Sequence, residues 1–198
     1  MTKLLEVLAA ILAGILVMIV HELIKAITFV LLDKSHRSWN VFCVQQYIDP
    51  VGLLFCVISK VGFSKSYMYK LKKRWITVSV GIMGFLSLLM MVGSGIIIYR
   101  SQYMNLNIQS LLISEDYSRI FQYLLLYYYM IISMSMFIIN LFPITTFDIG
   151  LIIASISPGR FLAMIRSDYI IKLILLFLIT IRFVKDCSNA IIIALLQW

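Results

Sequence analysis

Charged residues are scarce in this sequence, and proline, cysteine and histidine are scarcer still. Only 13% of the 198 residues are charged, whereas 62% are hydrophobic, and the mean hydropathy is +1.00. A chain of this composition is too apolar to form the core and surface of a water-soluble domain of its size. We therefore expect an integral membrane protein in which residues 1–198 form a single membrane-embedded domain.

The cysteines and the charge exclude further classes of protein. Cys43, Cys56 and Cys187 are odd in number and form no C-x-x-C pair, so the sequence predicts neither a disulfide framework nor a structural zinc site. The formal net charge is +8, but the basic residues flank apolar runs instead of alternating with aromatic residues along one face. This placement indicates membrane topology, with the lipid bilayer as a partner and no nucleic acid.

Long apolar runs predict an all-α polytopic fold with about four transmembrane helices. A membrane-spanning helix needs about 20 apolar residues, and the runs near this length are residues 4–32, 75–99, 120–142 and 169–185. Between the first two runs, residues 39–47 are rich in β-branched and aromatic residues, which predicts a short β-hairpin. The apolar run 51–59 is too short to span and predicts a re-entrant segment, or one packed at the interface.

Basic residues set the expected orientation in the cell membrane. Residues 60–74 contain six lysine or arginine residues, whereas the loop 100–119 is the least basic and contains Glu115 and Asp116. Loops rich in lysine and arginine stay on the cytoplasmic side of a membrane. We therefore expect the amino terminus outside and residues 60–74 in the cytoplasm.

Three ionisable residues, His21, Glu22 and Lys25, interrupt the first apolar run. Ionisable groups are costly within a bilayer, and for that reason they indicate a functional site. His21 and Lys25 lie four residues apart and share one helix face, with Glu22 on its flank. In H-E-x-x-H peptidases both histidines bind zinc and the glutamate is the general base. This sequence has Lys25 in place of the second histidine.

A second polar motif, N-L-F-P-I-T-T-F-D, covers residues 140–148 at the end of the third apolar run. Pro143 ends the helix, and Asp148 follows in a stretch that we expect to be unwound, where a carboxylate can turn inward toward a ligand. The third span returns to the cytoplasmic side in the expected topology. Asp148 should therefore meet His21 and Glu22 in the cytoplasmic half of the membrane.

Together the two motifs resemble the site-2 protease family of intramembrane zinc metalloproteases, in its compact form without a PDZ domain. The similarity covers about residues 17–177, because residues 48–52 resemble the family's D-P-x-G segment and residues 62–65 resemble its G-W-A-K segment. The resemblance implies zinc as cofactor and a membrane-embedded peptide or protein as substrate, cleaved near the cytoplasmic face. It also implies His21 and Asp148 as zinc ligands, Glu22 as general base and Asn140 as a residue that shapes the site by hydrogen bonding. Beyond the resemblance, we expect Lys25 and Pro143 to shape the site as well.

Departures from the family pattern leave three functions open. Lys25 replaces a histidine ligand, and a protonated lysine has no lone pair to offer to zinc. The first interpretation, which the sequence favours, is a zinc metalloendopeptidase whose metal site lacks one protein ligand. The second is a pseudoprotease that binds or regulates a membrane peptide, with a bridge from Lys25 to a carboxylate in place of the metal. The third is a small transporter, which neither paired broken helices nor repeated halves support.

Overall fold

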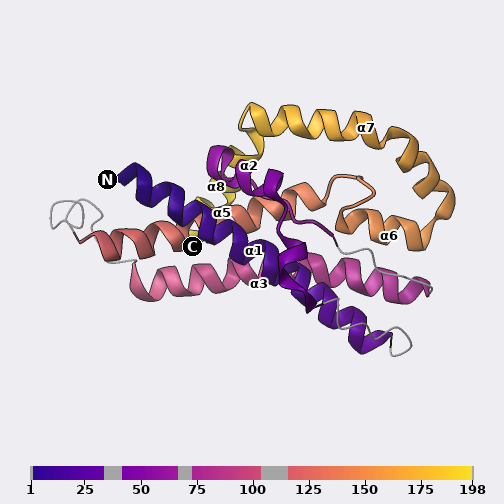
Figure 1. The fold of residues 1–198 in the computed structure, drawn as a ribbon, viewed down its shortest axis with the longest axis horizontal. Helices are drawn as coiled ribbons and strands as arrows, with labels where there is room; N and C mark the ends of the chain where they lie inside the picture. The colour runs from indigo at the N-terminus through magenta and orange to yellow at the C-terminus, as the bar shows by residue number, and fades with distance from the viewer. Residues whose placement is uncertain (1, 34–41, 67–72, 104–115, 198) are drawn as a thin grey trace.

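The computed structural model describes residues 2–33, 42–66, 73–103 and 116–197, and these residues contain no β-strand. Three long helices form the body of the molecule: α1 (Thr2–Leu32), α3 (Arg74–Gln102) and α5 (Tyr117–Asn140) (Figure 1). The shorter elements are the 3₁₀ helix η3 (Val44–Tyr47) and the helices α2 (Pro50–Ser59), α6 (Asp148–Ile156), α7 (Pro158–Thr180) and α8 (Phe183–Gln197).

The helices α1, α3 and α5 are each long and apolar enough to cross a membrane. They confirm the all-α class and agree with the first three expected spans. The fourth expected span, 169–185, falls on the end of α7 and the start of α8, and it is not among such helices in the described residues. Two features set it apart: α7 carries four charged side chains, and the chain turns at Arg182, where φ is 64°.

A 3₁₀ helix replaces the expected strands between the first two spans. Residues 44–47 form η3, and residues 39–41 of the predicted hairpin lie outside the described residues. Tyr47 is fully buried against Ala26 and Val30 of α1. The aromatic and β-branched character that indicated strands therefore serves packing against a helix, because β-propensity measures how well a side chain fits a half-buried surface.

The apolar run after η3, expected to be re-entrant or packed at the interface, forms a regular helix, α2. Asp49 caps it, since its Oδ1 accepts hydrogen bonds from the backbone N–H groups of Val51 (2.8 Å) and Gly52 (3.2 Å). Pro50 stands in the first turn, where its missing N–H costs nothing. The helix packs against α1, where a Cβ on Gly14 would lie 2.9 Å from Cys56 Sγ. The helical backbone hydrogen bonds of α2 meet the requirement that polar backbone groups in a membrane be satisfied internally.

Glycines of α3 let the short helix α6 approach closely. A Cβ on Gly81 would lie 2.8 Å from Ile152 of α6, and a Cβ on Gly84 would overlap the Asp148 carboxylate. Small residues permit such contact between membrane helices. The first residue of α6 is therefore placed directly against the middle of α3, next to α1.

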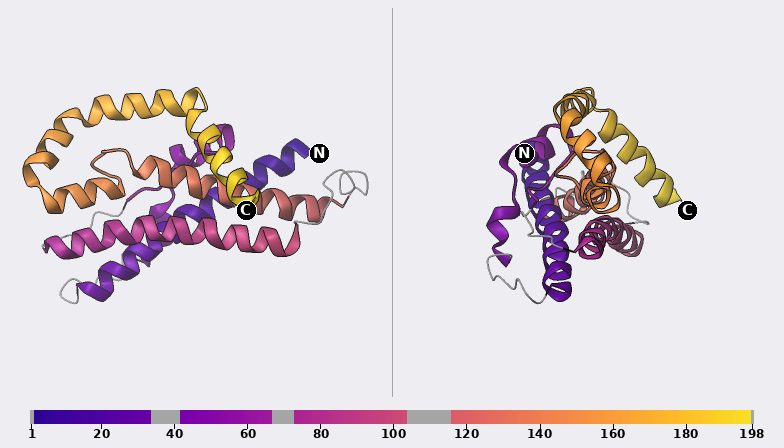
Figure 2. Two further views of the ribbon diagram at one scale, coloured as in Figure 1. Left: turned by 180° about the vertical axis from the view of Figure 1, so that it is seen from behind. Right: turned by 90° about the vertical axis from the view of Figure 1, so that its right-hand side faces the viewer.

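The helix α7 runs back along the side of the body that lies away from α3 (Figures 1 and 2). Its second half packs through Leu175 and Ile179 onto Ile139 and Ile144. Its first half is joined to the loop before α6 by Asp168, whose Oδ1 accepts hydrogen bonds from Thr145 N (2.9 Å) and Thr145 Oγ1 (3.0 Å).

Removing the Asp168 charge should weaken the contact between α7 and the loop before α6. Partial burial raises the pKa of Asp168, but the hydrogen bonds from Lys172 and Thr145 outweigh it and hold the pKa below the ordinary aspartate value. The carboxylate therefore stabilises the fold fully above about pH 4, and this contribution is lost as the pH falls through the lowered pKa of the folded state. We expect Asp168→Asn to lower the free energy of unfolding by about 1 kcal/mol at neutral pH, measured by circular dichroism in detergent.

The matched control is Asp186→Asn, which removes an exposed carboxylate from α8. It should cost only a few tenths of a kcal/mol, because Asp186 is an exposed charge in the first turn of α8. Equal effects of the two substitutions would show that Asp168 does not hold α7 in place.

Candidate functional site

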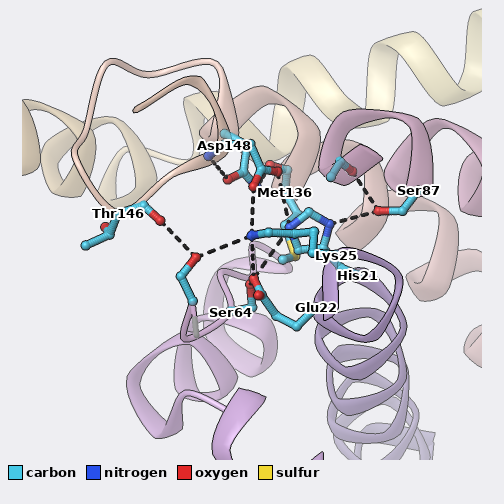
Figure 3. A network of polar contacts seen from close by, with 11 residues as sticks. His21, Glu22, Lys25, Ser64, Ser87, Met136, Thr146 and Asp148 are labelled. Atoms are coloured by element: carbon cyan, nitrogen blue, oxygen red, sulfur yellow. Dashed lines mark hydrogen bonds and ion pairs between the residues drawn. The ribbon is translucent and has the colours of Figure 1, made fainter. Parts of the chain in front are cut away.

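The structure brings together four ionisable residues that the sequence singled out. His21, Glu22 and Lys25 project from α1 and meet Asp148, the first residue of α6 (Figure 3). We call these four residues the polar cluster. Their exposed fractions are 0% for His21, Glu22 and Asp148 and 1% for Lys25. A cluster of charges so completely removed from solvent must be balanced internally.

Lys25 is the centre of the polar cluster. Its ammonium lies 2.8 Å from Asp148 Oδ1 in an ion pair and donates hydrogen bonds to Glu22 Oε1 (3.0 Å) and Ser66 Oγ (3.3 Å). An ammonium has three hydrogens and no lone pair. The three oxygen neighbours therefore match the donors that Lys25 has to offer, and one cation joins the two carboxylates.

His21 connects the polar cluster to α3. Its Nδ1 lies 3.0 Å from Ser87 Oγ, and the Ser87 hydroxyl donates its single hydrogen to Gly84 O at 2.6 Å. The hydrogen-bond network therefore assigns a proton to Nδ1 of His21. The other nitrogen, Nε2, faces Asp148 Oδ2 at 3.2 Å. Two lone pairs would repel at this distance, so the contact between them requires a proton or another cation.

Two residues at the end of α5 place Asp148. Asn140 ends the helix, donates from Nδ2 to Met136 O (2.9 Å) and accepts at Oδ1 from the backbone N–H of Asp148 (3.2 Å). Pro143 follows in the loop between α5 and α6, where it prevents the helix from continuing. Asn140 thus holds the backbone of Asp148 through a hydrogen bond. Asp148 itself is not in an unwound stretch: it begins α6, where a negative charge is favourable at the helix amino terminus.

Sequence reasoning missed the serines that surround the polar cluster. Ser64 donates to Glu22 Oε1 at 2.7 Å, and Ser66 accepts from Lys25 while donating to Thr146 O at 3.0 Å. Ser87 Oγ accepts the hydrogen bond from His21 Nδ1. Ser64 belongs to the segment that resembles G-W-A-K, but serine is common on membrane helices and in loops. Nothing in the sequence distinguished these three serines from the others.

A cleft of about 540 Å³ adjoins the polar cluster on the far side of Ser64 and Ser66. Its walls come from α2, residues 63–66, the loop 144–147 and the second half of α7, and we call it the α7 cleft. Its volume lies within the range of about 300–1,000 Å³ that is typical of ligand pockets. Residues 64–66 therefore form the wall between this cleft and the buried charges.

The polar cluster fits a zinc ion only in part. His21 Nε2 and Asp148 Oδ2 lie 3.2 Å apart. Two ligand atoms of a tetrahedral zinc ion with bonds of about 2.0 Å lie about 3.3 Å apart, so this pair has the spacing of two zinc ligands. The next ligand position, however, is taken by the Lys25 ammonium, which has no lone pair and would repel the metal. Among the described residues, no set of three His, Cys, Asp or Glu side chains is arranged to hold a metal ion. As they stand, these residues do not complete a zinc site.

Removing Lys25 should destabilise the fold strongly. Breaking a buried ion pair by deleting one partner leaves an uncompensated charge and costs about 3–5 kcal/mol. We expect Lys25→Met to lower the free energy of unfolding by an amount in this range, measured by thermal unfolding in detergent. The double variant Lys25→Met/Asp148→Asn should be more stable than Lys25→Met alone, because it removes one of the two orphaned carboxylates.

Lys60→Met is the matched control for a half-buried lysine outside the polar cluster. Lys60 lies over the Tyr128 ring at 4.2 Å, and an exposed contact of this kind contributes about 0.5–1 kcal/mol. If Lys25→Met costs no more than Lys60→Met, Lys25 does not balance the buried carboxylates.

Comparison with known proteins adds no family to this geometry. No family model matches the chain, and neither a curated protein nor a solved structure matches it. The resemblance to the site-2 protease family therefore rests on the motif residues quoted from the sequence. What the fold contributes is the meeting of His21, Glu22, Lys25 and Asp148 at one buried point.

Proposed function

We propose that this chain is a membrane-embedded pseudoprotease, a protein with the polar residues of an intramembrane metallopeptidase in which Lys25 takes the place of the metal. The observation that supports it is the position of the Lys25 ammonium, 2.8 Å from Asp148 and 3.0 Å from Glu22. The same two carboxylates are the ligand and the general base in the family that the sequence resembles. With both held by an ammonium, the site keeps its shape without a metal.

Its partner would be a membrane-embedded peptide or protein, which the chain binds or regulates without cutting. The basic segment 60–74 supports a topology in which the polar cluster lies toward the cytoplasmic side of the cell membrane. In this topology residues 169–185 form the fourth span, returning toward the outside.

Zinc content tests the proposal directly. Purified wild-type protein should hold well below one zinc per chain, whereas Lys25→His, which supplies a third ligand with a lone pair, should approach about one zinc per chain. Lys73→His, which adds a histidine on the exposed residue before α3, is the matched control and should stay at the wild-type level. Elemental analysis by mass spectrometry gives the ratio.

A wild-type protein that holds about one zinc per chain and loses it in His21→Ala would overturn the pseudoprotease proposal. A Lys25→His variant that folds but takes up no zinc would also count against it. That result would mean that His21 and Asp148 do not form the remainder of a metal site.

A zinc metallopeptidase with a thinned ligand set is the second candidate. Within the described part of the chain, Glu22 Oε2 has neither a hydrogen bond nor an ion pair, while His21 Nε2 and the two Asp148 carboxylate oxygens have ion-pair contacts but no hydrogen bond. Buried polar atoms left without hydrogen bonds call for a specific explanation, and a bound cation is one. This function requires Lys25 to leave the polar cluster when the metal binds.

Peptide cleavage separates the two candidates. The pseudoprotease should show no cleavage of membrane-embedded reporter peptides above that of Glu22→Gln, because neither protein has an active base beside a metal. For the metallopeptidase, Glu22→Gln should reduce the rate by about 100-fold or more, which is typical of a lost general base. Ser167→Ala, on the cytoplasmic part of α7 and outside the polar cluster, serves as the activity control.

A further inference from the structure

The α7 cleft carries two opposite charges that do not pair with each other. Asp49 and Lys65 both line the cleft, and within the described residues neither forms an ion pair. Asp49 uses only one carboxylate oxygen, Oδ1, to cap α2. Its other oxygen and the Lys65 ammonium are left to a ligand.

The third charged residue of the lining is already neutralised. Lys172 forms an ion pair with Asp168 on the same helix, and Asp168 is fixed in turn by Thr145. The charges that the cleft offers are therefore one anion and one cation. This pattern is complementary to a zwitterion, and it gives no net attraction for a purely anionic group.

The rest of the lining is mostly apolar, and besides its serines it offers the side-chain hydroxyls of Thr146 and Tyr169. Phe55, Phe63, Ile144 and Ile179 line it, while the hydroxyls of its serines are already bonded to Glu22 and Thr146. An extended peptide would bring backbone N–H and C=O groups into this trough with few partners, at a cost of about 1–3 kcal/mol for each group left unpaired. A hydrocarbon chain brings none.

The cleft is also placed where lipid can reach it. Leu173 and Leu176 of its α7 wall are 47% and 45% exposed, and such side chains on a membrane protein contact the bilayer. An acyl chain can therefore enter beside α7 while its headgroup stays near Asp49 and Lys65. Figure 1 shows α2 and α7 on the same side of the body, as this arrangement requires.

We propose that the α7 cleft binds a zwitterionic phospholipid with a primary amine, of the phosphatidylethanolamine type. One acyl chain lies on the apolar floor, the phosphate contacts Lys65 and the headgroup ammonium contacts Asp49. A primary ammonium donates hydrogen bonds, whereas the trimethylated ammonium of phosphatidylcholine has no hydrogen to donate. The headgroup is thus recognised by charge pattern and by donor. This site does not depend on whether the polar cluster holds a metal.

Native mass spectrometry of the detergent-purified, delipidated full chain tests this site. The probe is an equimolar mixture of phosphatidylethanolamine, phosphatidylcholine and phosphatidylglycerol with the same acyl chains. Wild type should retain phosphatidylethanolamine in preference to both others. Asp49→Asn should abolish the preference over phosphatidylcholine and leave the fold intact, because asparagine caps a helix as well as aspartate does.

Two further variants locate the site. Lys65→Gln should weaken phosphatidylethanolamine retention by about threefold, as expected for one partly exposed ion pair. Leu176→Trp should reduce retention of phosphatidylethanolamine without changing any charge, because the larger ring fills the cleft. Lys73→Gln removes an exposed lysine that does not line the cleft and should behave as wild type.

Three results would overturn the proposal. They are a preference for phosphatidylglycerol, an unchanged lipid preference in Asp49→Asn, and equal losses in Lys65→Gln and Lys73→Gln. Recovery of a peptide instead of a lipid, crosslinked to a photoreactive group at position 173, would assign the cleft to a peptide partner. None of these outcomes changes the zinc content of the protein, so they are distinguishable from a failure of the pseudoprotease proposal.

Discussion

The ammonium of Lys25 is the contact on which the centre of this structure depends. It lies between a carboxylate of α1 and a carboxylate of α6, and it also bonds the segment that contains Ser66. Two carboxylates this deeply buried could not both remain ionised without a cation. The lysine therefore does more than neutralise a neighbour on its own helix. It holds three parts of the chain, far apart in sequence, at one point.

The neighbouring helices are shaped to allow this meeting. Gly84 leaves room on α3 for the Asp148 carboxylate, and Asn140 fixes the backbone of Asp148 at the start of α6. Ser87 orients His21 from the same helix that carries Gly84. A buried polar network of this kind is favourable only when its members are satisfied. The local choices of small, amide and hydroxyl residues thus all serve the same four ionisable side chains.

The sequence predicts the members of the polar cluster better than it predicts their surroundings. His21, Glu22 and Asp148 were identifiable because a charge in an apolar run is costly and because Pro143 marks the end of a helix. The same reasoning anticipated a bridge from Lys25 to a carboxylate in one of the three interpretations that it left open. The serines were not identifiable, because their contacts with Glu22 and His21 span 42 and 66 residues of sequence, and no local pattern encodes them. Residues 44–47 were misread as part of a strand for a related reason: a short stretch of aromatic and β-branched residues fits a strand or a packed helical turn, and only its tertiary contacts decide.

Charge balance explains how a metal site can lose its metal and keep its form. A zinc ion brings two positive charges to a pair of carboxylates. In this chain the Lys25 ammonium supplies one, and a proton between His21 Nε2 and Asp148 Oδ2 would supply the other. The two arrangements are equal in charge but different in chemistry, because an ammonium has no vacant coordination position and cannot act as a Lewis acid. It is also tethered by its own side chain, so it cannot leave the site as an ion can. Under the proposed function, Lys25 in place of a histidine therefore preserves the packing of α1, α3 and α6. It removes the zinc ion that would act as the Lewis acid. The polar cluster then serves as the support for residues 64–66, which line the α7 cleft.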